Sequence, residues 1–224
     1  MAKGKKYREA CKKFDPEALH PLERAVEIVK GLSYVKFDET VDIAIRVNRG
    51  KKELSVRDTL VLPHSFQKEQ KILVFAKGEK AEEARAAGAT HVGAEDLVEK
   101  IRGGWLDFDV AVATPDMMKD VGKLGPILGR RGLMPNPKTR TVTFDIKETI
   151  GELRKGRVEF RADKAGVIHL PVGKVSMEGD KILENVRAVL HEVEKKRPED
   201  VKGEFIRSIA VSSTMGPGVR VSTN

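Results

Sequence analysis

The segment KILVFAKGEKAEEARAAG, residues 71–88, joins a short continuous apolar run to a helix-forming run that ends in glycine. A continuous apolar run of this length is typical of a strand buried on both faces of a parallel sheet. The same alternation recurs in HVGAEDLVEKIRGG (91–104), which predicts a short strand and a helix, and in FDVAVAT (108–114), which predicts another buried strand. Pro115-Asp116 then predicts the start of a further helix, since proline suits a first helical turn. This rhythm indicates a small parallel α/β domain.

The segments on either side of this region have a different pattern. On the N-terminal side, residues 21–31 predict a helix, and KFDETVDIAIRV (36–47) alternates apolar with polar residues, as expected of a half-buried strand. A second strand is predicted over 56–62. On the C-terminal side we predict, in order, strands over 157–163 and 166–173 joined by a turn, an amphipathic helix over 181–196 and a last strand over 204–214.

The two ends of the chain therefore resemble each other, whereas the middle differs from both. We predict an α/β chain in which a discontinuous domain, residues 1–65 plus 157–224, carries an inserted parallel α/β domain, residues 66–156. Such an insertion is tolerated because the termini of a domain often lie close together.

The charge balance points to a polyanionic partner. The chain has 224 residues and a formal net charge of +8, and its pI is about 9.5. A pI above 9 suggests nucleic acid or an anionic membrane, although a basic protein with no such partner is the alternative. Aromatic residues make up only 5%, which disfavours a stacking platform for single-stranded RNA and is compatible with recognition of folded RNA. The basic N-terminus, MAKGKKYREACKKF, fits either an RNA-binding arm or the solvated start of a helix.

Other classes of function find little support. The single cysteine, Cys11, excludes an intrachain disulfide and suits a reducing cytoplasm, and no Cys/His pattern has zinc-ligand spacing, so we expect no metal and no cofactor. No segment approaches the roughly 18 apolar residues of a membrane span, and we expect no membrane partner. A nucleotide-dependent α/β enzyme is the main alternative, but neither G-x-x-x-x-G-K-[ST] nor G-x-G-x-x-G after a strand is present, and G-x-S-x-G is absent. We therefore expect no enzymatic activity.

The densest basic stretch is KDVGKLGPILGRRGLMPNPKTR, residues 119–140, with six cations and one acid, Asp120. Glycine allows close backbone approach, and proline lowers the entropy lost on ordering. The combination predicts a preorganised basic loop suited to phosphate, with a solvated loop as the alternative. The cations on which we place the contact are Lys123, Arg130, Arg131 and Lys138.

Two further segments have the chemistry of an RNA contact. In SSTMGPG (212–218), Thr214 offers a hydroxyl, Met215 can pack on a ribose or base, and Gly216 lacks the side chain that would keep a sugar away. Taken alone, an ordinary polar turn is the simpler interpretation of this segment. In KFDET (36–40), Lys36 could reach a phosphate and Phe37 could pack on a sugar, although a lone phenylalanine is more often a core residue.

Several motifs together resemble the bacterial form of the L-one family of large-subunit ribosomal proteins. They run in order along nearly the whole chain. They are KFDETV (36–41), VLPH (61–64), AKGEKAEEA with the following AGA (76–89), GWLDFDVAVATPDMM (104–118), LGPILGRRGLMPNPK (124–138), GRVEFRADKAGVIHLPVGK (156–174) and TMGP (214–217). One departure is visible: residues 47–57, with Arg49, Lys51 and Lys52, are shorter and differently charged than the family pattern.

The resemblance implies a split βαβ domain with an antiparallel sheet, formed by both chain ends, and a Rossmann-like insertion without a nucleotide. It implies a monomer when free of the ribosome, which binds the stalk region of large-subunit rRNA beside the tRNA exit site, aids release of deacylated tRNA, and represses translation of its own mRNA. Carried over to this chain, the RNA contacts fall on Lys36, Phe37, Thr40, Ser208, Thr214, Met215 and Gly216, with His169 and Lys174 as secondary candidates. The basic stretch then becomes a second, less tight contact with RNA or tRNA.

An RNA-binding regulator outside the ribosome, using the same surface, is the alternative to this ribosomal role. Tight co-sedimentation with large subunits distinguishes the two.

Overall fold

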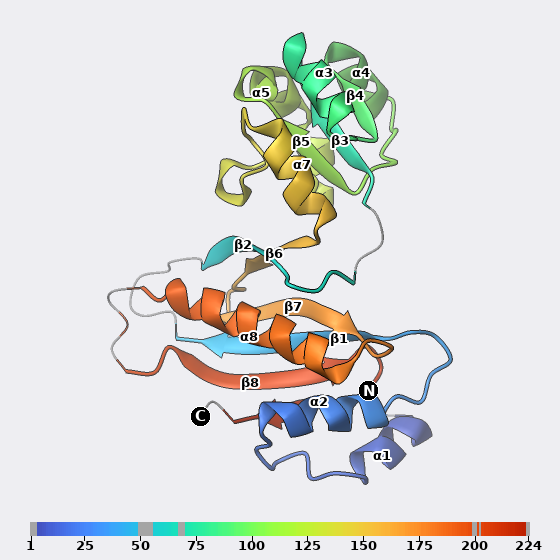
Figure 1. The fold of residues 1–224 in the computed structure, drawn as a ribbon, viewed down its shortest axis with the longest axis vertical. Helices are drawn as coiled ribbons and strands as arrows, with labels where there is room; N and C mark the ends of the chain where they lie inside the picture. Colours follow the sequence, from blue (N-terminus) through green and yellow to red (C-terminus); the bar gives the residue numbers. More distant parts are fainter. Residues whose placement is uncertain (1–3, 49–55, 67–69, 199–200, 202, 223–224) are drawn as a thin grey trace. The chain divides into compact units, whose positions relative to one another are not determined.

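The structure, a computed structural model, describes residues 4–48, 56–66, 70–198, 201 and 203–222 (Figure 1). The chain divides into two compact units, which we call the flanking unit, Met1–Phe66 with Val158–Asn224, and the inserted unit, Gln67–Arg157. The flanking unit contains an antiparallel sheet and the inserted unit a parallel one, so the predicted α/β class is confirmed. Within the described residues, no helix is long and apolar enough to cross a membrane.

The sheet of the flanking unit has the strand order β7-β1-β8-β9. Its strands are β1 (Thr40–Val47), β7 (Val167–Lys174), β8 (Ile206–Ser213) and β9 (Val219–Val221). All neighbouring strands are antiparallel, and Ala44 of β1 lies opposite His169 of β7 and Ala210 of β8. The central strand thus comes from the N-terminal part of the chain, and its neighbours come from the C-terminal part.

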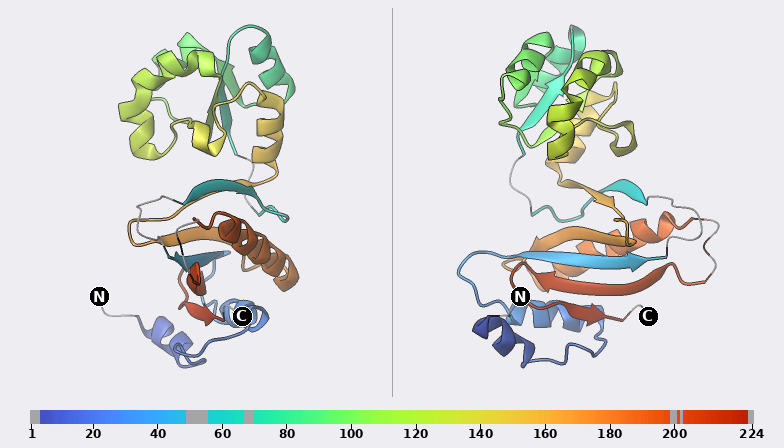
Figure 2. Two further views of the ribbon diagram at one scale, coloured as in Figure 1. Left: turned by 90° about the vertical axis from the view of Figure 1, so that its left-hand side faces the viewer. Right: turned by 180° about the vertical axis from the view of Figure 1, so that it is seen from behind.

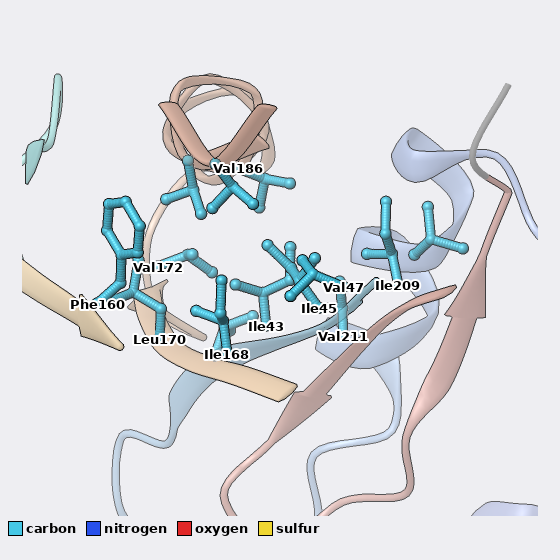
Figure 3. Close-up of a cluster of buried hydrophobic side chains, with 14 of the residues drawn as sticks. Ile43, Ile45, Val47, Phe160, Ile168, Leu170, Val172, Val186, Ile209 and Val211 are labelled. Atoms are coloured by element: carbon cyan, nitrogen blue, oxygen red, sulfur yellow. The ribbon is translucent and has the colours of Figure 1, made fainter. Parts of the chain in front are cut away.

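Helices α2 (Leu22–Gly31) and α8 (Gly179–Lys195) cover one face of this sheet (Figure 1). The alternation of apolar and polar residues in β1 explains this arrangement. Ile43 and Ile45 are fully buried, and they lie on the side of the sheet that faces Val186 of α8 (Figure 3). Burying each such side chain contributes about 1.5–3 kcal/mol. The hydrophobic period of β1 and that of α8 therefore select the covered face.

Among the residues that the structure describes, no helix lies over the opposite face of the sheet, as the view from behind shows (Figure 2, right). We call this side the open face. On β1 it carries Thr40, Asp42, Ala44 and Arg46, which alternate with the buried residues. The side chains that the sequence nominated for RNA contact, apart from those of the basic stretch, lie on this face or at the end of it where β8 finishes.

Three smaller features complete the flanking unit. Strands β2 (Arg57–Val61) and β6 (Arg157–Arg161) form a separate two-stranded sheet. Between β6 and β7, the Asp163 carboxylate accepts hydrogen bonds from the N–H groups of Ala165 and Val167, which builds the predicted turn. The short helix α1 (Lys5–Cys11) begins the described chain.

The inserted unit has a parallel sheet with the order β4-β3-β5. Its strands are β3 (Ile72–Phe75), β4 (His91–Gly93) and β5 (Val110–Ala113). All residues of β3 are buried, as the apolar run predicts, because Leu73 and Phe75 pack into one core cluster and Ile72 and Val74 into another. Around the sheet lie helices α3 (Glu79–Ala86), α4 (Glu95–Arg102) and α7 (Ile146–Arg154).

The first half of the basic stretch is not a loop, and that part of the prediction is wrong. Its first half forms a series of short helical turns: α5 (Met118–Val121), η2 (Gly122–Leu124), α6 (Gly125–Leu128) and η3 (Gly129–Arg131). Val121, Leu124 and Leu128 are spaced three and four residues apart, and they are fully buried. Their burial in the core outweighs the flexibility of the intervening glycines.

Other differences concern the ends and number of elements. The strand predicted over 36–47 begins only at Thr40, and α7 and β9 are elements that the sequence does not predict. Of the departing segment 47–57, Arg49, Lys51 and Lys52 lie outside the described residues.

A buried amide links three parts of the flanking unit and predicts a large loss of stability on removal. The Asn185 side chain is fully buried, donates to the carbonyl oxygens of Val172 (2.8 Å) and His64 (2.9 Å), and accepts from the His64 N–H (2.9 Å). Asn185→Ala leaves these groups unpaired and should lower the free energy of unfolding by at least about 2 kcal/mol in urea titration. The neighbouring Glu184→Ala, which removes an exposed partner of His64, should cost less than about 1 kcal/mol. Equal losses for the two variants would contradict this account.

Candidate nucleic-acid interface

The turn Thr214–Gly216, which we call the TMG turn, follows β8 and is attached to the start of β1. Thr214 N–H donates to the Thr40 carbonyl (3.1 Å), and Thr40 N–H donates to Thr214 Oγ1 (3.1 Å). The Thr214 hydroxyl also donates to the Thr40 carbonyl (3.3 Å). This hydroxyl, which we expected to face a ligand, is thus first of all a clamp between two strands, although the side chain remains exposed.

The backbone of Met215 is held from both sides. Its N–H donates to Glu39 Oε1 (2.8 Å), and its carbonyl accepts from the Tyr34 hydroxyl (2.6 Å). Glu39 is only 1% exposed, whereas Met215 is 50% exposed. A fixed backbone therefore presents an adaptable apolar side chain to solvent.

A cation joins the same cluster from β7. Lys174 Nζ donates to Thr40 Oγ1 (2.7 Å), and the next residue, Val175, donates its N–H to the Glu39 carbonyl (2.9 Å). Beside it, the Asp38 carboxylate accepts from the Ser176 N–H and hydroxyl. These side-chain contacts hold residues 36–39 outside the sheet ladder, which explains why the strand starts later than predicted.

The structure brings part of the predicted site together. Thr40, Lys174 and the TMG turn form one hydrogen-bonded cluster, and Lys36 and Phe37 are exposed on the segment that leads into it. Ser208 lies at the other end of β8, opposite Arg46, roughly 20 Å from the turn at about 3.4 Å per residue. His169 lies midway along β7, opposite Ala44. The last two residues share the open face but not the cluster.

Four residues of this region are not predicted from the sequence. Tyr34 and Glu39 hold the TMG turn, while Arg46 and Arg220 are exposed cations, on β1 and on β9. The period of two in β1 could have indicated Arg46, since it falls on the same face as Thr40. Nothing in the sequence pairs Glu39 with a residue 176 positions away.

Asp42 lies on the open face, and burial raises the pKa of its carboxyl, with the charges of Lys174 and His169 opposing the shift. A negative charge on Asp42 therefore lowers the stability of the folded state, and it would also repel a bound polyanion. Asp42 is therefore the group on this face whose removal has the clearest predicted sign.

We expect Asp42→Asn to raise the Tm at pH 7. A carboxyl whose pKa is raised by folding stabilises the protein only while it is protonated, and this contribution is lost as the pH rises through the raised pKa. The increase should vanish as the pH falls below the ordinary value of 3.8. Asp163→Asn is the opposite control, because hydrogen bonds from the backbone, first that of Val167, lower the pKa of Asp163. A lower Tm for Asp42→Asn at pH 7 would refute the sign.

Gly216 makes a close approach to another residue inside the turn. A Cβ at this position would overlap the Ser213 Oγ, while Ser213 Cβ lies 3.6 Å away, an ordinary contact. Ser213 is 3% exposed, and its hydroxyl has no hydrogen-bond partner among the described residues. The obstacle to a side chain at position 216 is thus a single buried oxygen atom.

This geometry predicts a rescue. Gly216→Ala should distort the TMG turn and lower the Tm, and Gly216→Ala combined with Ser213→Ala should recover most of the loss, since the overlapping oxygen is gone. Ser213→Ala alone should be nearly neutral, because the hydroxyl has no protein partner to lose. Thermal melts of the four proteins form a double-mutant cycle, and additive effects would contradict the proposed overlap.

In the inserted unit, the cations of the basic stretch are exposed on its helical turns. Lys123 pairs with Asp120 (2.8 Å), whereas Arg130 and Arg131 form no ion pair within the part of the chain that the structure describes. Lys138 follows Asn136, whose side chain accepts the Lys138 N–H and caps the next turn. The stretch thus presents exposed positive charge on and beside short helical turns.

The carboxyl edge of the parallel sheet, where a nucleotide would bind in such a fold, has the wrong charge for phosphate. The first turns of α3 and α4 carry Glu79, Glu82, Glu95 and Asp96, which oppose an anion at the helix N-terminus. Lys77, two residues after the end of β3, pairs with Glu95 (2.7 Å). Over the described ranges there is also no group of three or more His, Cys, Asp or Glu side chains that could hold a metal ion.

An uncovered sheet face, a fixed turn with exposed hydroxyl, apolar and cationic groups, and a second cationic surface are the features of a binding protein. The family model described as "Ribosomal protein L1p/L10e family" matches residues 29–217. The chain belongs to this family of ribosomal proteins.

Similar proteins span its whole length. The chain is 61% identical over 221 residues to "Large ribosomal subunit protein uL1" of Treponema denticola, covering 99% of this chain and 97% of the relative. It is 59% identical to proteins of the same description from Borreliella afzelii, over 98% of this chain and 96% of the relative, and from Borrelia duttonii, over 99% of both.

Proposed function

We propose that this protein is a constituent of the large ribosomal subunit that binds the stalk region of large-subunit rRNA through the TMG turn and the adjoining open face. The observation that carries the proposal is the exposure of two apolar side chains, Phe37 (54%) and Met215 (50%), beside a hydrogen-bonded cluster that holds the backbone around them. Exposed apolar groups in such a setting indicate a contact surface.

The chemistry of the cluster suits folded RNA. Lys36 and Lys174 supply positive charge for phosphates, the hydroxyls of Thr40 and Thr214 can exchange hydrogen bonds with 2′-hydroxyls, and Phe37 and Met215 can pack on sugar or base faces. Because internal hydrogen bonds already order the turn, little further entropy is lost on binding.

Three further parts of the proposal rest on the family resemblance. The protein aids release of deacylated tRNA from the exit site, with Lys123, Arg130, Arg131 and Lys138 as a secondary contact with RNA or tRNA. It represses translation of its own mRNA through the same surface. Free of the ribosome, it is a cytoplasmic monomer. Exposed cations on helical turns of the inserted unit are compatible with the tRNA contact.

The test compares two equally exposed phenylalanines. Phe37→Ala should weaken binding to a stalk fragment of large-subunit rRNA by about 5- to 150-fold, the range for one base–aromatic contact. Phe144→Ala, which removes a 52% exposed phenylalanine from the inserted unit, should bind like the wild type. Filter binding at two salt concentrations measures both, and both variants should retain stability within about 0.5 kcal/mol because neither side chain is buried.

The outcomes separate the site from the function. Equal binding by both variants and the wild type would mean that the protein binds this RNA elsewhere. Failure of the wild type to bind, or to co-sediment with large subunits, would contradict the function itself.

A further inference from the structure

Helix α1 carries positive charge that no other part of the described chain neutralises. Its surface exposes five cations in and just after the helix: Lys5, Lys6, Arg8, Lys12 and Lys13. None forms an ion pair with another described residue, whereas Arg24, Lys80 and Arg187 on other helices each pair with a glutamate. The helix itself carries one acid, Glu9, so its three cations and the two that follow it leave an excess of positive charge, which is unfavourable at close spacing unless an external anion offsets it.

The same helix forms one wall of a surface pocket of about 590 Å³, within the range of small-ligand sites. Tyr7, Arg8 and Lys12 line it from α1, and Pro217 and Gly218 line it from the opposite side. The lining is more apolar than polar, and the side chains of Arg8 and Lys12 add positive charge to it. An aromatic ring, a proline and two cations are groups that can hold a base or ribose together with its phosphate.

The pocket continues directly from the candidate RNA site, because Pro217 and Gly218 are the residues that follow the TMG turn. An acid, Glu17, also lines the pocket, but it pairs with Arg220 (2.7 Å), so its charge is offset. A polyanion that lies across the turn therefore meets net positive charge on this side.

We infer that the pocket between α1 and Pro217–Gly218 takes a nucleotide of the same RNA that the TMG turn contacts, with the base or ribose against Tyr7 and Pro217 and the phosphate held by Arg8 and Lys12. The inference rests on the proposed function. It assigns the N-terminal basic segment to the RNA interface, which the sequence alone left open between an arm and a solvated helix.

Salt dependence provides the test, in the full-length protein with the stalk fragment of rRNA as probe. Removing two phosphate contacts with Arg8→Gln/Lys12→Gln should lower the slope of log K against log salt by about 2 and weaken binding at 0.1 M salt by at least about tenfold. Glutamine is a good helix former, so α1 should persist. Tyr7→Ala should weaken binding about 5- to 150-fold, and Tyr7→Phe should retain most of it.

Lys181→Gln/Arg187→Gln is the matched control, because it removes the same charge from exposed positions of α8, the helix on the covered face of the sheet. Its salt slope should stay within one unit of the wild type.

Each other outcome is decisive. If the pocket variants match this control while Phe37→Ala still loses binding, the pocket assignment is wrong and the proposed function stands. If the pocket variants bind the RNA normally but no longer co-sediment with large subunits, the partner of α1 is a protein, and the inference fails. If the wild type does not bind the fragment, both the function and the inference fall.

Discussion

The hydrogen bonds between Thr40 and Thr214 join two residues that are 174 positions apart, and the candidate interface depends on them. They continue the β1–β8 ladder beyond the end of β8 and fix where the chain turns. Without these hydrogen bonds, the TMG turn would not be attached to β1, and nothing would fix the close approach of Gly216 to Ser213. The insertion of a whole unit between β1 and β8 is compatible with the clamp because β7 and β8 both return to β1, one on each side.

Buried polar groups give this region its rigidity. Glu39 accepts one backbone hydrogen bond with Oε1, while Oε2 has no partner among the described residues. A buried carboxylate with an unused oxygen is costly. An unfavourable group of this kind is retained only where the rest of the fold holds it in place. Unfavourable groups are found most often at binding sites. Asn185 differs, since all of its hydrogen-bonding groups take part in contacts that join β7, α8 and the end of the N-terminal segment.

The fold could be predicted from the sequence wherever burial imposes a period. The alternation in β1 and the apolar run of β3 each reflect how many faces of the strand are covered, and both were assigned correctly. The failures have a common cause: side chains that act over long sequence distances. Asp38 and Glu39 detach residues 36–39 from the ladder through partners near 176 and 215. In the same way, Leu124 and Leu128 turn a glycine-rich stretch into helical turns because a core exists for them to enter.

The two units differ in where their charged side chains lie, at the ends of helices or on open surfaces. In the inserted unit, acids occupy the first turns of α3 and α4, the positions where a nucleotide-binding domain would need to attract phosphate. Its cations lie elsewhere, on the turns around Arg130 and Arg131. In the flanking unit, Lys174 and Arg46 stand on or beside a sheet face that no described helix covers, and Asp42, the acid among them on β1, has a raised pKa because burial disfavours its charge. A surface of this kind attracts a long polyanion over its whole extent rather than one phosphate group at one point, which is the requirement for recognising a folded RNA.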